Sequence, residues 1–176
     1  MRRLLDAFVA FWSTLFQPSS ERKGQKFEEL IQDAVFTEEH YDLIHLTQDG
    51  TTNYIRYVKS SEYPDFKFQD KSNGKKFWVE AKYRQDSYKD KIMWASEKQL
   101  KRYKEYDEEL PLFIAIGVGG FGNASYPDFL YIIPVRQIKY IGLYESFLRQ
   151  YEVYNTKSKD PDHPFSSSLL WKLLSK

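Results

Sequence analysis

The pattern of hydrophobic and polar positions divides the chain into helical and strand-like segments. Apolar residues recur at the three- and four-residue spacing of an amphipathic helix in five segments: 4–16, 21–35, 94–106, 136–151 and 167–174. Segments rich in aromatic and β-branched residues, which favour strands, are 63–68, 76–83, 112–118 and 129–135. This pattern predicts an α/β fold in which a central mixed β-sheet is flanked by helices.

Two segments allow more than one interpretation. Residues 41–47 alternate as a strand does, but they could also be the exit of the preceding helix. Residues 52–59 are either a strand or a helical insertion. At 176 residues the chain is long enough for one core, so we expect an N-terminal amphipathic helix over 1–18 and a single domain over 19–176.

The N-terminal helix has several interpretations. Asp6 and Trp12 interrupt its apolar stretch, and residues 17–20 lack a small-x-small cleavage site, so we do not expect a secretory signal. The helix could pack on its own domain, contact a membrane surface, or bind a second copy or another protein partner.

The segment from Tyr63 to Arg84 combines strand character with charge. At strand spacing, Glu80 and Lys82 share one face of residues 76–83. The turn formers between Asp70 and Lys75, including Asn-Gly, predict that the two flanking runs fold into an antiparallel hairpin. Such a hairpin can bring Asp65 beside Glu80.

This arrangement suits a metal ion. Two neighbouring carboxylates repel each other unless a cation lies between them, and hard oxygen ligands favour Mg²⁺ or Mn²⁺. A lysine within reach of a metal-bound water then suits in-line displacement at phosphorus. The alternative is an ordinary surface hairpin that carries a charged pair on its outer face.

The order Pro64-Asp65, a gap of 14 residues, and then Glu80-Ala81-Lys82 resembles the PD-(D/E)XK nuclease superfamily, whose fold is called restriction-endonuclease-like. Gly24-x-x-x-Glu28 is similar to an element on the first helix of many members. Gln99-x-x-x-Tyr103 is similar to an element of RecB-like members. The resemblance covers roughly residues 24–135.

The resemblance implies roles for individual residues. Asp65, Glu80 and the Ala81 carbonyl would bind Mg²⁺ or Mn²⁺, and Lys82 would position or activate water or stabilise the pentavalent phosphorane. The remaining implied site residues, which would border or assist the site, are Glu28, Gln99 and Tyr103. The implied activity is metal-dependent cleavage of DNA, by either endo- or exonucleolytic action. A catalytically silent nucleic-acid-binding or assembly module with the same fold is the alternative.

The tetrapeptide Tyr-Pro-Asp-Phe occurs twice, at 63–66 and at 126–129. Either Asp65 or Asp128 could therefore be the functional aspartate. Because an apolar strand without Glu-x-Lys follows Asp128, we expect Asp65 to be the site residue.

The charge distribution favours contact with nucleic acid. The chain has a net charge of +1, but residues 67–104 contain 12 Lys and Arg against 5 Asp and Glu, which leaves −6 for the remainder. A set of solvated lysines is the alternative to phosphate contact. Residues expected to contact DNA are Lys67, Arg84, Lys89, Lys91, Lys98, Lys101 and Arg102.

Composition excludes several other classes of site. The chain has no cysteine and only three widely spaced histidines, so thiolate and histidine zinc sites are not expected. No apolar run reaches the roughly 20 residues that a membrane span requires. These features are typical of a cytoplasmic protein.

Overall fold

A computed structural model describes residues 19–47, 63–86, 90–156 and 165–175. The N-terminal helix predicted over 1–18 and the segment 52–59 lie outside the described residues. The division into an N-terminal helix and one further domain therefore stays a prediction.

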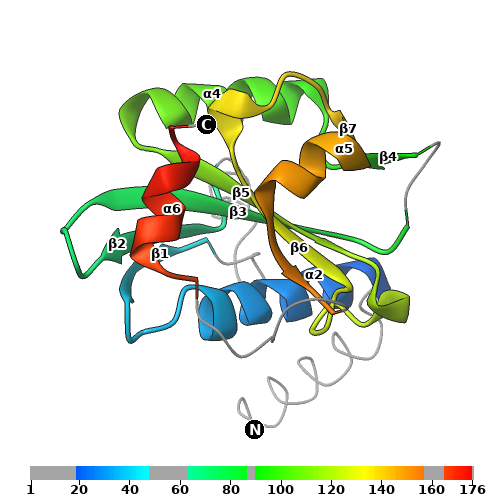
Figure 1. Ribbon diagram of the computed structural model, residues 1–176, viewed down its shortest axis with the longest axis horizontal. Coiled ribbons are helices and arrows are strands. Elements are labelled where there is room, and N and C mark those ends of the chain that lie inside the picture. Colours follow the sequence, from blue (N-terminus) through cyan, green and yellow to red (C-terminus); the bar gives the residue numbers. More distant parts are fainter. Residues whose placement is uncertain (1–18, 48–62, 87–89, 157–164, 176) are drawn as a thin grey trace, which may run out of the picture.

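A six-stranded mixed sheet forms the centre of the molecule (Figure 1), with the strand order β1-β2-β3-β5-β6-β8. Neighbouring strands are antiparallel except for β3 and β5, which are parallel. The strands of this sheet are β1 (Tyr41–Leu46), β2 (Phe66–Asp70), β3 (Lys76–Arg84), β5 (Leu112–Val118), β6 (Phe129–Pro134) and β8 (Glu152–Asn155). The predicted central mixed sheet is confirmed, and residues 41–46 form a strand.

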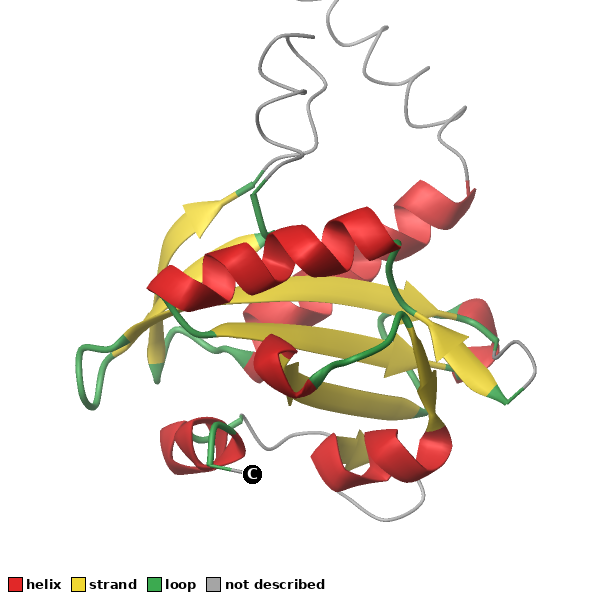
Figure 2. Cartoon of the chain, turned by 90° about the horizontal axis from the view of Figure 1, so that it is seen from above, coloured by secondary structure: helices red, strands yellow, loops and turns green. Residues whose placement is uncertain are grey.

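Helices cover both faces of the sheet (Figures 1 and 2). α4 lies on the face that carries Trp78 and Glu80, and it forms the crossover that the parallel pair β3–β5 requires. α2, the π-helical turn that follows it and α6 lie on the opposite face, which carries Phe77. These helical elements are α2 (Ser19–Leu30), η1 (Ile31–Val35), α4 (Glu97–Glu109) and α6 (Ser167–Leu173).

A glycine allows α2 to pack closely on the sheet. The Phe27 side chain is fully buried, and its ring lies directly over Gly117 of β5. A Cβ atom at Gly117 would lie 2.3 Å from Cε2 of Phe27. The absence of a side chain at residue 117 therefore sets how closely α2 approaches β5.

Asp70, at the end of β2, fastens α6 to the hairpin. Its carboxylate is completely buried and accepts hydrogen bonds from Ser72, Asn73, Ser167 and Trp171. Burial alone would raise the pKa of Asp70, but the hydrogen bonds from Ser167, Ser72 and Trp171 outweigh it and lower this pKa to about 2. The C-terminal helix is therefore attached through a charged acceptor.

The prediction of one helix over 136–151 is wrong. The segment contains the short turn η3 (Val135–Gln137), strand β7 (Gly142–Tyr144), α5 (Glu145–Leu148) and the turn η4 (Arg149–Tyr151). β7 pairs with β4 (Lys91–Met93) in a separate two-stranded sheet. Because this pairing satisfies backbone groups that a helix would have satisfied internally, helical spacing of apolar residues does not decide the local structure here.

Two boundary predictions also differ from the structure. α4 begins at Glu97 and not at Trp94, because Ser96 accepts the Gln99 N–H and caps the helix. Helical spacing over 21–35 would place Ala34 on the same face as Ile31, but Ala34 is exposed, since the helix widens to π geometry after Leu30. Within the described part of the chain, no helix is long and apolar enough to cross a membrane.

Candidate metal and phosphodiester site

The candidate site lies where β2 separates from β3. Asp70 and Lys75 face each other in the hairpin, and the Asp70 N–H donates to the Lys75 carbonyl at 2.9 Å. In an antiparallel pair every second facing pair is hydrogen-bonded, so Phe68–Phe77 and Phe66–Val79 are hydrogen-bonded pairs too. The last pair of the ladder is Phe66–Val79. The same register would place Pro64 opposite Ala81. Because proline has no N–H, the Ala81 carbonyl receives no ladder hydrogen bond from this position.

Beyond the last ladder pair, hydrogen bonds of Asp65 join the two strands. Its Oδ2 accepts the Ala81 N–H at 2.7 Å, and its own N–H donates to Oε2 of Glu80 at 3.3 Å. The Asp65 carbonyl accepts the Thr47 N–H at 2.8 Å, which ties this residue to the end of β1. The predicted juxtaposition of Asp65 and Glu80 is therefore present.

Glu80 is 3% exposed and is held by two further groups. Oε1 of Glu80 accepts a hydrogen bond from the Tyr103 hydroxyl of α4 and forms an ion pair with the Lys82 ammonium. Strand alternation places Glu80 and Lys82 on the face that α4 covers, and Tyr103 lies on the inner side of that helix. Two carboxylates, one amine and one phenol are thus joined by direct contacts around Glu80 and Ala81.

The neighbouring negative charges make ionisation of Asp65 unfavourable. Burial, the charge of Glu80 and the charge of Glu28 raise the pKa of Asp65 well above its usual value. Lys82 and the Ala81 N–H act in the opposite direction without cancelling this effect. A cation near Asp65 would favour its ionised form.

Lys82 is held in its charged form. Burial would lower its pKa, but the charges of Glu80 and Asp65 outweigh burial and raise the pKa of Lys82. Burial and the neighbouring Glu80 also raise the pKa of Tyr103, so its hydroxyl stays a hydrogen-bond donor. The two carboxylates therefore favour the ammonium form of Lys82.

The donor set fits Mg²⁺ or Mn²⁺. The Asp65 and Glu80 carboxylates and the Ala81 carbonyl supply only oxygen atoms, and Mg²⁺ is commonly held by one or two carboxylates with water completing its shell. In the described segments, no group of three or more His, Cys, Asp and Glu side chains is arranged to hold a metal ion. A metal bound here would therefore depend on the Ala81 carbonyl and on water as well as on two carboxylates.

The other residues of the predicted site lie in different positions. Glu28, from α2, is near enough for its charge to raise the pKa of Asp65. Gln99 serves the helix itself, because its Oε1 accepts hydrogen bonds from the Ser96 N–H at 2.9 Å and from the Ser96 hydroxyl at 3.2 Å. Of the two residues of the Gln-x-x-x-Tyr element, Tyr103 contacts the carboxylate cluster. Gln99 instead binds Ser96, the N-cap residue of α4.

The second Tyr-Pro-Asp-Phe sequence has a different environment. Oδ2 of Asp128 accepts the Gly120 N–H at 2.8 Å and closes the loop between β5 and β6. A Cβ atom on Gly119 would lie 2.2 Å from the same oxygen. Asp65 is the aspartate that lies beside Glu80, and Asp128 holds a glycine-rich turn.

Four of the cations expected to contact DNA lie against other groups of the fold, and Arg84 and Lys67 are two of them. Arg84 donates to the carbonyls of Met93, Tyr83 and Trp94 at 2.6–2.8 Å, so it anchors the segment before α4. The ammonium of Lys67, on β2, lies 4.8 Å from the ring centre of Trp78.

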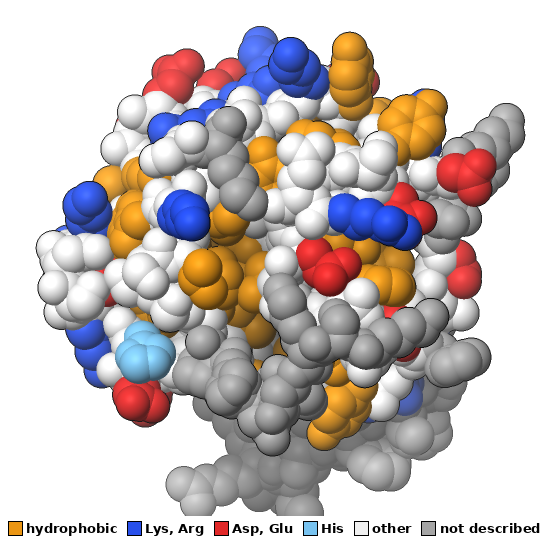
Figure 3. Space-filling view, in the orientation of Figure 1, with side chains coloured by type: hydrophobic (Ala, Val, Ile, Leu, Met, Phe, Trp, Pro, Cys, Tyr) orange, Lys and Arg blue, Asp and Glu red, His pale blue; other side chains and the backbone are white. Residues whose placement is uncertain are grey.

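The remaining cations lie on or near α4. Lys91 sits over the Tyr144 ring at 4.6 Å, Lys98 and Lys101 are exposed on α4, and the Arg102 guanidinium lies 5.2 Å from the Tyr103 ring centre. Figure 3 shows Lys and Arg side chains in the region of α4, with Asp and Glu beside them. Lys89 lies outside the described residues.

The sequence analysis missed a group of four rings beside the carboxylates. We call this group the aromatic wall; its members are His45, Tyr63, Trp78 and Tyr106. The centres of neighbouring rings lie 5.7–6.2 Å apart. Its sequence signal is spacing: Tyr63 and Trp78 precede Asp65 and Glu80 by two residues each, which places them on the same strand faces.

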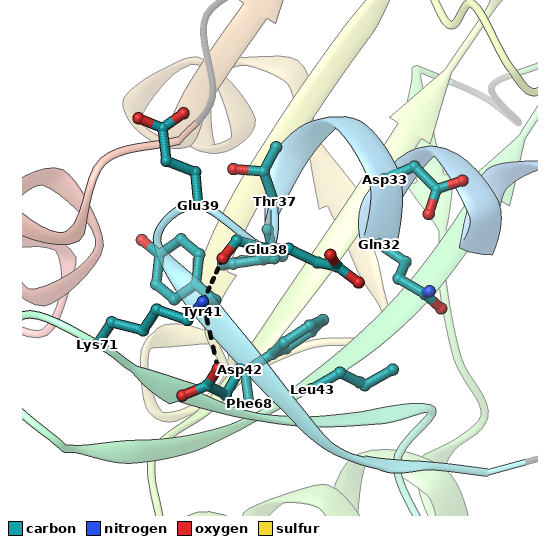
Figure 4. A pocket seen from close by; sticks show the side chains of 11 residues that line it. Gln32, Asp33, Thr37, Glu38, Glu39, Tyr41, Asp42, Leu43, Phe68 and Lys71 are labelled. Carbon is teal, nitrogen blue, oxygen red and sulfur yellow. Dashed lines mark hydrogen bonds and ion pairs between the residues drawn. The ribbon is translucent and has the colours of Figure 1, made fainter.

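A separate pocket of about 530 Å³ lies between η1 and β1 (Figure 4). The pocket is lined by Asp33, Glu38, Glu39 and Asp42 with apolar rings beneath them. Lys71 pairs with Asp42 at 3.3 Å and donates to the Glu38 carbonyl, as the dashed lines of Figure 4 show. The pocket contains none of the carboxylates of the candidate site.

Comparison with known proteins finds similarity to solved structures and none at the level of sequence. No protein-family model and no curated protein match the sequence. The 1.6 Å structure of Hjc from Archaeoglobus fulgidus, a Holliday junction resolvase from an archaeal hyperthermophile, is similar over 63% of this chain and 80% of that chain. The identity is 11% and the TM-score is 0.42. A similarity at this level says nothing about the activity of the present chain.

Proposed function

We propose that the protein is a metal-dependent nuclease of the PD-(D/E)XK type that hydrolyses phosphodiester bonds in DNA. The observation that supports this proposal is the convergence of Asp65, Glu80 and Lys82 at the point where Pro64 leaves the Ala81 carbonyl without its ladder partner. The raised pKa of Asp65 adds to it, because crowded carboxylates favour a bound cation.

The proposed chemistry assigns each group one task. Asp65, Glu80 and the Ala81 carbonyl would hold Mg²⁺ or Mn²⁺, which supplies Lewis-acid stabilisation of the reacting phosphate oxygens. Lys82, as an ammonium, would stabilise the negative charge that develops on the phosphate oxygens. Tyr103 keeps Glu80 oriented through its hydrogen bond, and Glu28 adds negative charge beside Asp65.

The substrate assignment rests on charge and position. Lys67 lies over the Trp78 ring, and Arg102 lies beside the Tyr103 ring whose hydroxyl binds Glu80. Lys98 and Lys101 extend the positive charge along α4. Cations that neutralise phosphates supply most of the sequence-independent affinity for DNA.

The deciding experiment is a cleavage assay with the purified protein. Linear, circular, single-stranded and branched DNA are incubated with Mg²⁺, with Mn²⁺ or with EDTA. We expect cleavage only with a divalent cation. The pattern of products on linear and circular DNA then distinguishes endonucleolytic from exonucleolytic action.

The repeated tetrapeptide offers a matched control. Asp65→Asn should remove metal-dependent cleavage, whereas Asp128→Asn makes the same change in the same tetrapeptide and should leave cleavage in place. Lys82→Ala should also remove cleavage while the circular dichroism spectrum is retained. Full activity of Asp65→Asn, or no cleavage by the unmodified protein on any of the four DNAs, would contradict the proposal.

A further inference from the structure

Arg102 lies beside the carboxylate cluster with one of its donors unused. Its guanidinium rests 5.2 Å from the centre of the Tyr103 ring, and the hydroxyl of that ring binds Glu80. The Nε atom of Arg102 is buried and has no hydrogen-bond partner in the described part of the chain. A buried donor without an acceptor is unfavourable, so an oxygen atom that reached this guanidinium would be bound favourably.

The position of Arg102 on α4 fixes the direction it faces. Tyr106 follows it by four residues, which places the two side chains on the same side of the helix. The Tyr106 ring lies 5.8 Å from the Trp78 ring and 5.7 Å from the Tyr63 ring. Arg102 therefore faces the side of the site on which Asp65 and the start of β2 lie.

The aromatic wall occupies that same side. Trp78 is 7% exposed and forms its base, whereas Tyr63 is 46% exposed and offers a ring to the surface. Tyr63 comes two residues before Asp65, so its Cα lies about 7 Å along the chain from that of the aspartate. Lys67 lies over the Trp78 ring. An exposed ring, two cations and the carboxylate cluster are thus contiguous.

These features indicate a nucleotide more than a peptide. Cations beside a phosphodiester site bind phosphate, and an exposed aromatic ring binds the face of a base. In a duplex each base face is already covered by its neighbours, so a side chain can stack only on a base that is unpaired and splayed out.

We propose that this surface binds an unpaired nucleotide next to the bond that is cut. Arg102 binds the phosphate of this nucleotide through its guanidinium, and Tyr63 stacks on its base. The inference rests on the proposed nuclease function. It specifies the substrate as DNA with single-stranded nucleotides at the cleavage point.

A binding assay tests the inference without requiring cleavage. Fluorescence anisotropy in EDTA at low salt measures the affinity of the full chain for a labelled single-stranded oligonucleotide and for a duplex of the same sequence. Tyr63→Ala should weaken binding of the single strand about 5- to 100-fold, with less than a twofold change for the duplex, and Tyr63→Phe should bind as the unmodified protein does.

The role of Arg102 is tested by how strongly the DNA affinity depends on the salt concentration. Arg102→Ala should weaken binding about tenfold and lower the slope of log affinity against log salt by about one, because one phosphate contact is lost. Arg102→Lys should restore the slope but only part of the affinity, since an ammonium cannot bind a phosphate through two fixed donors.

Two matched variants serve as controls. Lys104→Ala removes an exposed cation from another side of α4, and Tyr140→Ala removes a tyrosine that is 72% exposed beside the β4–β7 sheet. Both should bind the single strand within twofold of the unmodified protein.

The outcomes separate the two proposals. If Tyr63→Ala weakens the duplex and the single strand equally, or if Arg102→Ala binds as the controls do, the inference is wrong even where the protein cleaves DNA. If the binding effects are found but no cleavage occurs with Mg²⁺ or Mn²⁺, the nucleotide site stands and the nuclease proposal fails.

Discussion

Replacing Asp70 with asparagine tests how the C-terminal helix is held. Oδ2 of Asp70 accepts hydrogen bonds from Asn73 at 3.0 Å, from Trp171 at 2.6 Å and from the Ser167 hydroxyl. Oδ1 accepts the N–H and the hydroxyl of Ser72. An asparagine has only one acceptor oxygen, so the donors on one side of the side chain would face an amide nitrogen.

The pKa of Asp70 gives the magnitude. It falls from 3.8 to about 2 in the folded protein, and each unit corresponds to about 1.4 kcal/mol, so the charge contributes about 2 kcal/mol to the free energy of unfolding at neutral pH. Because the folded pKa is the lower one, this stabilisation is complete above pH 3.8 and is lost as the pH falls through 2. At pH 3 about half of it should be left.

Urea unfolding followed by circular dichroism measures the effect. Asp70→Asn should be less stable than the unmodified protein by about 2 kcal/mol at pH 7, and the difference should be about half as large at pH 3. Asp42→Asn is the control, because Asp42 forms an exposed ion pair with Lys71 and should cost less than about 1 kcal/mol. Equal stability at pH 7, or a difference that does not change with pH, would refute the reasoning.

Three further substitutions test the site and the packing beneath it. In EDTA, Asp65→Asn should be more stable than the unmodified protein at pH 7. The raised pKa of Asp65 makes its ionised form unfavourable in the folded state, so the gap should close as the pH falls toward 3.8; a variant that is less stable at both pH values would contradict this. Tyr103→Phe should lower kcat/KM about 10- to 100-fold, since Glu80 loses the hydrogen bond that orients its carboxylate; an unchanged kcat/KM would count against this role. Gly117→Ala should cost about 1–3 kcal/mol in urea unfolding, because its Cβ would meet the Phe27 ring at 2.3 Å, and wild-type stability would show that α2 can move away.

Short-range patterns in the sequence were sufficient for the hairpin and its chemistry. Alternation placed Glu80 and Lys82 on one face, and the Asn-Gly turn placed Asp65 opposite them, because both depend on residues close together in the chain. The strands at 112–118 and 129–134 and the helix at 167–173 were predictable for the same reason.

Contacts between distant segments decided the features that the sequence did not predict. The segment 136–151 has helical spacing, yet β7 forms within it because β4, some fifty residues earlier, offers a strand edge. Gln99 lies one turn from Tyr103 as the motif requires, but because Ser96 is the N-cap of α4, the Gln99 side chain completes the capping box.

The same distinction applies to the candidate site. The sequence by itself determined which acids and which amine meet, since a hairpin fixes them locally. Only the tertiary structure decided that Tyr103 reaches Glu80 and that the four rings of the aromatic wall lie together. It also decided that no acceptor from the described segments reaches the Arg102 Nε. These contacts join β2, β3 and α4, and their geometry depends on how the helix packs across the sheet, which no spacing along the chain encodes.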